Sequence, residues 1–168
     1  MKIVSKNQYP EELEITHIVE NLFRKYNIPV FTEDIIVEKG VVPHSHPVLT
    51  LNTRSSDERS VLFVLVHEQF HWYAEGAENY NNAIDFLKLK YLDDGEHNKN
   101  GLNDNSYWEH IIVCFNTRNY LKRFLNEADF DWVYKQWLAY PSLEKMIAER
   151  YVEIEQELKG LNMVFENK

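Results

Sequence analysis

The chain has 168 residues, of which 44% are apolar and 14% aromatic, and this composition suits one folded domain over residues 1–168. It excludes a chain that is disordered throughout. The formal net charge is −9, from 27 acidic and 18 basic residues, so the chain as a whole repels a polyphosphate backbone and no nucleic-acid partner is expected.

The N-terminal third shows a helical pattern followed by two strand patterns. Apolar residues at helical spacing over Leu13–Phe23 predict an amphipathic helix, which Asn27 and Pro29 end. Two stretches rich in β-forming residues follow, Val30–Val37 and Pro47–Thr53, with a turn-prone segment between them. In the second stretch apolar and polar residues partly alternate, which predicts a half-buried strand or a strand at the edge of a small sheet.

A second helix is expected from Ser55 to about Glu75. Ser55 and Glu58 have the spacing of a capping box, and Gly76 is a typical C-terminal stop. This helix contains the longest apolar run of the chain, Val61–Val66, which is far too short to span a membrane. Because the first residues also lack the apolar stretch of a signal peptide, we expect a cytoplasmic protein without a membrane partner.

The C-terminal half is predicted to be helical apart from one long polar loop, Asp93–Ser106. The expected helices are Asn82–Leu92, Tyr107–Leu125, Phe130–Leu138 and a last one that begins at Pro141 and ends at Gly160. The single cysteine, Cys114, lies in an apolar run, so a buried and inert thiol is expected. The whole pattern predicts an α+β fold, mostly helical, with a small N-terminal sheet.

The motif that carries chemistry is His67-Glu68-Gln69-Phe70-His71, an H-E-x-x-H sequence on the predicted second helix. Residues four apart lie on one helix face about 6 Å apart, so the imidazoles of His67 and His71 can reach one metal ion. Glu68 is rotated by about 100° from His67, where it can contact a water molecule on that ion without being a ligand. Zinc lowers the pKa of such a water towards about 7, and a neighbouring carboxylate accepts the proton.

The residues around the two histidines favour a metal site. Those between and beside His67 and His71 are uncharged apart from Glu68, so the helix is expected to be buried. Buried imidazoles are costly unless a ligand or a hydrogen bond satisfies them. The alternative is a pair of core histidines bonded to backbone carbonyls. We favour the metal site, with Zn²⁺ as the ion.

At this motif the chain resembles the zincin metallopeptidases, and within them the gluzincin-like group with its short IrrE/ImmA-type members. The resemblance covers roughly residues 15–71: a leading helix, strands, the segment Leu49-Thr50-Leu51-Asn52, a capped helix with Arg59, and then the motif. It implies a zincin-like fold whose edge strand, residues 48–53, pairs with an extended peptide substrate. Ala74 and Ala77 stand where metzincins have glycine and histidine, which excludes that subclass.

A catalytic zinc site takes three protein ligands, so one more must come from elsewhere in the chain. On the predicted helix Tyr107–Leu125, a wheel places Arg118 and Lys122 towards solvent and His110 nearly opposite to them. We therefore expect this helix to pack on the motif helix, with His110 as the third ligand. Glu109 lies nearer the edge of the buried face and is the alternative, which the gluzincin resemblance favours.

Other polar residues are weaker candidates. Glu75 shares the motif helix but lies two turns beyond His67, so a supporting or surface position is expected. The remaining histidines are expected in solvent or in polar loops: His17, His44, His46 and His97. For His44 and His46, whose alternate spacing can put both near the cleft, a catalytic role is the alternative. Tyr73 and Tyr107 can donate to a developing oxyanion, but ten tyrosines in the chain single out neither.

The sequence therefore predicts a zinc-dependent peptidase, with Glu68 as general base and a peptide or protein as substrate. One alternative is a regulatory module of the IrrE/ImmA type that acts on one partner protein. Another is a metal-binding protein without catalysis. Glu68 disfavours the last of these, because a purely structural zinc ion needs no base beside it.

Overall fold

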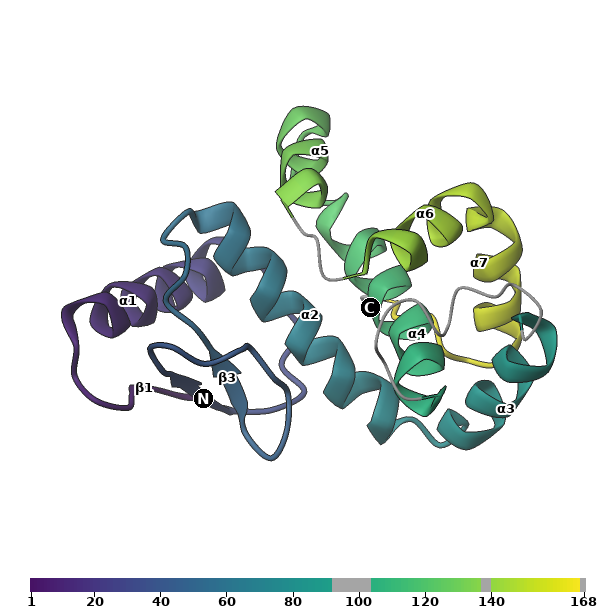
Figure 1. The fold of residues 1–168 in the computed structure, drawn as a ribbon, viewed down its shortest axis with the longest axis horizontal. Helices are drawn as coiled ribbons and strands as arrows, with labels where there is room; N and C mark the ends of the chain where they lie inside the picture. Colours follow the sequence, from purple (N-terminus) through teal and green to yellow (C-terminus); the bar gives the residue numbers. More distant parts are fainter. Residues whose placement is uncertain (92–103, 137–139, 167–168) are drawn as a thin grey trace.

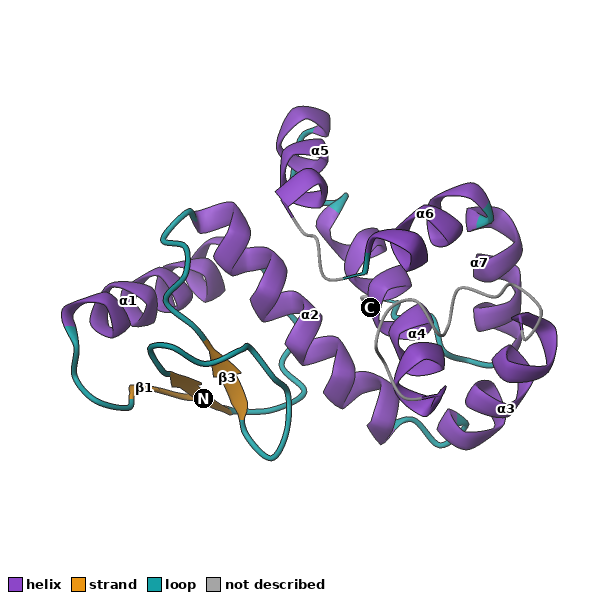
Figure 2. Ribbon diagram, viewed as in Figure 1, coloured by secondary structure: helices purple, strands orange, loops and turns teal. Residues whose placement is uncertain are grey.

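The architecture is α+β, mostly helical, with one small sheet, and the computed structural model describes residues 1–91, 104–136 and 140–166 (Figure 1). Along the chain the described elements are β1 (Lys2–Ser5), α1 (Pro10–Lys25), β2 (Asp34–Val37), β3 (Leu49–Leu51), α2 (Glu58–Gly76), α3 (Tyr80–Tyr91), α4 (Asp104–Leu121), α5 (Glu127–Gln136), α6 (Pro141–Glu149) and α7 (Tyr151–Gly160). Figure 2 shows that the sheet and α1 lie on one side of α2, and that α3, α4, α6 and α7 lie on the other.

The sheet is parallel throughout, in the order β1-β2-β3. Lys2 pairs with Asp34 and Ile35 pairs with Leu49, so β2 is the central strand. The sequence did not predict β1, because four residues give too short a pattern to read. It also extended β2 too far towards the N-terminus, where the Gln69 side chain accepts backbone N–H bonds from residues 31 and 32 in place of a strand ladder.

β3 is an edge strand by its position in the sheet, as predicted, but the expected half-burial is wrong, because all three of its residues are buried. Its outer edge is covered by residues 41–46, which we call the edge strap. The His44 N–H donates to the Thr50 carbonyl (3.1 Å), and the Thr50 N–H donates to the His44 carbonyl (2.8 Å). The outward backbone groups of Thr50 are therefore already paired within the chain.

Helix α1 is attached to the sheet through a buried carboxylate, Glu12. Its oxygens accept hydrogen bonds from the Ser5 hydroxyl (2.8 Å), from the Asn7 backbone and side chain (2.7 and 3.0 Å), and from the Lys39 backbone (2.9 Å). Burial raises the pKa of Glu12, but these donors outweigh burial and lower it to about 2. The carboxylate form is therefore the one that stabilises this corner of the fold.

Replacing Glu12 by glutamine is expected to lower the free energy of unfolding at pH 7 by about 2 kcal/mol, because an amide cannot accept from all of these donors. The folded pKa lies below the ordinary value of 4.5, so the stabilisation is complete above pH 4.5 and is lost as the pH falls towards 2. Urea unfolding measured across this pH range should show the free energies of unfolding of wild type and Glu12→Gln becoming equal. The exposed Glu14→Gln change on the same helix is the control, and parallel pH profiles for wild type and Glu12→Gln would contradict the expectation.

Helix α2 begins one residue after Asp57, so the predicted Ser55 capping box is wrong. The Asp57 carboxylate accepts from the Arg59 and Ser60 backbone N–H groups, which satisfies the free donors of the first turn. The Ser55 hydroxyl instead accepts from the Asp57 N–H at 3.2 Å. The far end of the helix, at Gly76, is where the sequence predicted it.

Helix α4 packs on α2, as predicted, and the residues from Tyr107 to Thr117 are all buried. The expected solvent-facing position of Arg118 is wrong: its guanidinium lies 5.0 Å from the ring centroid of Tyr134 and 3.9 Å from the Glu144 carboxylate. α4 therefore has no broad exposed face, because helices surround it. Cys114 is fully buried, and burial raises the pKa of its thiol, as expected of an inert cysteine.

The remaining helix boundaries differ from the sequence prediction mainly in the last third. The expected helix from Pro141 to Gly160 is two helices, because Arg150 leaves the helical conformation (φ −109°, ψ 24°) between α6 and α7. Most of the predicted loop Asp93–Ser106 lies outside the described residues, and α4 already begins at Asp104. Across the described segments, no helix has the length and apolar character that crossing a membrane requires.

Candidate metal centre

Three buried histidines meet where α2 packs on α4. His67 and His71 lie one helical turn apart on α2, and His110 reaches them from α4. One ring nitrogen of each lies within 4.8 Å of the others, and in the described parts of the chain this is the group of side chains that could hold a metal ion. The structure thus places His110, and not Glu109, in the cluster with the two motif histidines.

In two of these histidines, a hydrogen bond determines which ring nitrogen carries the proton and which has the lone pair. His71 Nδ1 lies 2.5 Å from a Glu109 carboxylate oxygen, and His110 Nδ1 lies 2.6 Å from the Ser106 carbonyl oxygen. Both partners are acceptors, so each Nδ1 carries the proton and donates it. The lone pair of each ring is then on Nε2, the atom a metal ion would bind.

The surroundings also set the charge of the three rings. Burial lowers the pKa of His67 far below its ordinary value and lowers that of His110 to about 4, so both are neutral. Burial opposes the cation of His71 as well, but the hydrogen bond to Glu109 outweighs it and raises the pKa of that ring. A cation at this point would compete with the proton on His71 and would be favoured by the Glu109 charge.

Glu109, the alternative third ligand, has a different place. Its second carboxylate oxygen accepts a hydrogen bond from the Tyr80 hydroxyl at 2.9 Å, so the carboxylate is shared between His71 and the first turn of α3. Burial raises the pKa of Glu109, but the bonds from His71 and Tyr80 lower it below its ordinary value. This arrangement, in which a carboxylate orients a histidine, is common around metal-binding imidazoles. It connects α2, α3 and α4 through one chain of hydrogen bonds.

Glu68 directly follows His67 on α2 and is buried. Burial raises the pKa of its carboxyl to about 7, and the charge of His71 partly opposes that rise. A carboxyl that titrates near neutrality can both accept a proton and return it, which is what a general base and acid must do. Its helix position keeps it adjacent to the histidines but outside their cluster.

A tyrosine that the sequence did not single out contacts the cluster. The ring of Tyr140 lies 4.3 Å from that of His110 and 6.4 Å from that of His67, between their centroids. Tyr107 is buried against Trp108, and Tyr73 packs on Phe31 away from the histidines. The sequence gives no sign of this contact, because Tyr140 lies 30 residues after His110 and approaches it only through the packing of α6.

Glu75, His46 and His17 are not members of the cluster. Glu75 is well exposed and its carboxylate lies 3.3 Å from His46 Nε2. His46 also stacks on Trp72, with centroids 4.1 Å apart. The expectation that His17 faces solvent is confirmed, since 75% of its side chain is exposed. His97 lies outside the described residues.

A cleft of about 700 Å³ leads towards the site between α2, α5 and the edge strap. It is lined on the α2 side by Phe63 and Val64, which precede His67 by one turn, and on the other sides by Pro43 and Trp132 among others. Phe63 also faces His67, with ring centroids 6.1 Å apart. The histidines themselves do not line the cleft, so Phe63 is the point at which cleft and cluster adjoin.

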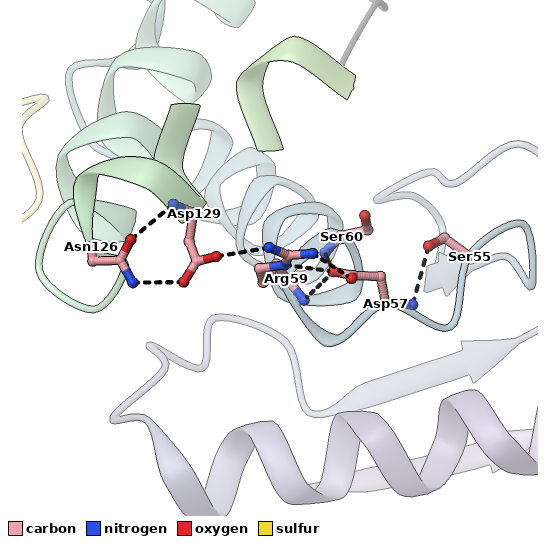
Figure 3. A network of polar contacts seen from close by, with 6 residues as sticks. All are labelled: Ser55, Asp57, Arg59, Ser60, Asn126 and Asp129. Atoms are coloured by element: carbon pink, nitrogen blue, oxygen red, sulfur yellow. Dashed lines mark hydrogen bonds and ion pairs between the residues drawn. The ribbon is translucent and has the colours of Figure 1, made fainter. Parts of the chain in front are cut away.

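A network of ion pairs fixes the wall of this cleft that α5 provides (Figure 3). Arg59 donates to the Asp57 carboxylate at the start of α2 and to Asp129 in the first turn of α5 (2.7 Å). The Asn126 side chain accepts from the Asp129 N–H and donates to its carboxylate, so it caps α5. The Arg59 guanidinium also lies 3.9 Å from the ring centroid of Trp132. One arginine therefore connects the capped ends of both helices that face the cleft.

The donor set fits a divalent transition metal. Three imidazoles suit zinc, and three protein ligands are the number that leaves a coordination position open for chemistry. Glu109 and the Ser106 carbonyl hold the rings of His71 and His110 through Nδ1, so little rotation is needed to present Nε2 to an ion. In comparisons with known proteins, no protein-family model, curated protein or solved structure matches this chain.

Proposed function

We propose that this chain is a zinc-dependent peptidase of the zincin type, with His67, His71 and His110 as metal ligands and Glu68 as general base. The observation that carries the proposal is the convergence of three buried imidazoles next to a buried carboxyl on the H-E-x-x-H helix. A purely structural site would gain nothing from that carboxyl, whose burial costs free energy.

His67, His71 and His110 would hold the zinc ion, which would supply Lewis acidity towards the substrate carbonyl and towards the attacking water. Glu68 accepts the proton of the attacking water and delivers it to the leaving amine. Glu109 holds His71 so that its ring cannot turn, and the Ser106 carbonyl does the same for His110. Burial around the cluster excludes bulk water and strengthens each of these interactions.

The cleft favours a peptide over a small amide. Its volume of about 700 Å³ is large enough for several side chains, and it ends at Phe63, whose ring faces His67. Its walls combine apolar residues, Phe63 and Trp132, with polar ones, Asn52 and Arg54. Such a lining suits an extended chain with mixed side chains. The alternative, action on one partner protein, uses the same chemistry with a narrower choice of substrate.

Metal removal tests the proposal. The purified protein is expected to contain close to one zinc ion per chain and to cleave members of a mixed peptide library, followed by mass spectrometry. Treatment with 1,10-phenanthroline should abolish cleavage, and one equivalent of zinc should restore it. A protein that binds neither zinc, manganese nor iron would contradict the proposal. Zinc binding without cleavage of any library member would favour the partner-specific or the non-catalytic alternative.

A further inference from the structure

The edge strap runs along one ridge of α2. The ridge consists of Val64, Glu68, Trp72 and Glu75, which lie on one face because they are spaced by four, four and three residues. At one end, Pro43 of the strap lines the same cleft as Val64. At the other end, the Ser45 carbonyl accepts a hydrogen bond from Trp72 Nε1 (2.9 Å). His46 then stacks on Trp72 and its Nε2 lies 3.3 Å from the Glu75 carboxylate.

His44 is the strap residue between these two ends, and Glu68 is the ridge residue between them. The strap and the helix therefore bring His44 opposite Glu68. The electrostatics agree, because the His44 ring and the Glu68 carboxyl interact across the space between the strap and the helix. The two histidines of the strap thus have different surroundings, although the sequence treats them alike.

The His44 ring is held in a defined orientation. Its backbone is bonded to Thr50 at both N–H and carbonyl, and its Nδ1 lies 2.9 Å from the Val42 carbonyl oxygen. A carbonyl can only accept, so Nδ1 carries the proton and Nε2 has the lone pair. The side chain is exposed, so Nε2 can be reached by a bound molecule. A histidine with an anchored backbone, an oriented ring and an accessible acceptor atom is arranged as a binding group, unlike an ordinary loop residue.

We propose that His44 is a second catalytic residue of this site, whose Nε2 accepts a hydrogen bond from the N–H of the peptide bond that is cleaved. The proposal rests on the proposed peptidase function. As the bond breaks, the amide nitrogen becomes pyramidal and must direct its lone pair at Glu68 to receive a proton. Holding its N–H on the His44 side sets that direction, because the lone pair then points away from His44. His44 forms no covalent bond and transfers no proton in this step.

A thermodynamic cycle between enzyme and substrate isolates this hydrogen bond. A cleaved peptide and its ester analogue, which has oxygen in place of the N–H, are compared with wild type and with His44→Ala. The amide is expected to lose about 10- to 100-fold in kcat/KM on His44→Ala, and the ester close to nothing. The intrinsic difference in reactivity between ester and amide cancels in the ratio. Zinc content and Tm should match wild type, since the backbone bonds to Thr50 remain.

Binding gives a readout that does not depend on turnover. In the Glu68→Gln background, isothermal titration should show the amide bound several-fold more tightly than the ester, and His44→Ala should remove that preference. His46→Phe, which keeps the ring on Trp72, is the control on the same strap and is expected to change both substrates equally. Equal amide and ester effects of His44→Ala in an active enzyme would overturn the role of His44 alone. A zinc-loaded wild type that hydrolyses no peptide would overturn the proposed function, and this proposal with it.

Discussion

Replacing His71 by alanine is expected to lower zinc affinity by more than about 100-fold, because it removes both a metal ligand and the partner of Glu109. His67→Ala and His110→Ala should have comparable effects, since each of the three rings contributes one nitrogen to the cluster. Competition with a chromophoric chelator measures the affinity, and elemental analysis of the purified variants measures the retained metal. Loss of the ion should also lower Tm, because the bound metal stabilises the folded state.

Glu109 is the matched comparison for this prediction. Glu109→Gln keeps the shape of the side chain but weakens its hold on His71, so a loss of about 10- to 100-fold is expected, smaller than for any of the histidines. Tyr80→Phe, one hydrogen bond further out, should have a smaller effect still. A larger loss for Glu109→Gln than for His110→Ala would show that the carboxylate is the third ligand. Equal and small losses for both would place the ligand elsewhere.

Glu68→Gln is expected to retain one zinc ion per chain and to reduce kcat by about two to four orders of magnitude. The amide has the size of the carboxyl it replaces, so the packing beside His67 and His71 should be kept, but it cannot accept a proton. Steady-state kinetics on a cleaved peptide, with elemental analysis on the same sample, gives both quantities. The change should appear in kcat and much less in KM, because Glu68 acts on the attacking water and not on substrate binding.

Glu75→Gln provides the control for Glu68→Gln on the same helix. Its carboxylate is exposed and lies beside His46, so the variant should have the kcat of the wild type. Unchanged turnover in Glu68→Gln would show that another group is the base. Loss of zinc from Glu68→Gln would instead show that the carboxyl helps to hold the metal, and a fall in rate would then say nothing about proton transfer.

The part of the site that the sequence predicted is the part that local geometry determines. His67, Glu68 and His71 lie within five residues of one helix, so the 3.6-residue repeat alone sets their directions. The uncharged residues around them also predicted burial, and all three are buried. The same holds for the end of α2 at Gly76.

The third histidine depended on tertiary packing, which a helical wheel does not contain. The wheel assumed that Arg118 faces solvent, whereas it packs on Tyr134 and approaches Glu144. Since helices surround α4, Glu109 and His110 are both buried, and burial does not choose between them. The choice is made by Tyr80, which engages Glu109, and by the Ser106 carbonyl, which orients His110. Neither contact leaves a pattern in the sequence.

The pairing of the strands, by contrast, could not be predicted from the sequence. β1 and β3 each have only three or four residues, and their place on either side of β2 comes from long-range parallel contacts. The strap that covers β3 is a loop in sequence terms, and its bonds to Thr50 follow no periodic signal. The resemblance to peptidases with a free edge strand therefore predicted a strand at the position of β3. The backbone N–H and carbonyl of its central residue, Thr50, are however already bonded to His44.

The origin of the cluster in two separate helices has a consequence for the biosynthesis of this chain. His67 and His71 emerge from the ribosome together, but His110 follows 39 residues later, after α3. A nascent chain that has folded only as far as α2 offers an ion two nitrogens, which exchange it readily with the many imidazoles and thiols of the cell. Tight retention of the proposed zinc ion would begin only when α4 docks and His110 joins the other two histidines. Acquisition of the proposed zinc ion would then be one of the last events of maturation, and a chain truncated before residue 110 would lack the third ligand.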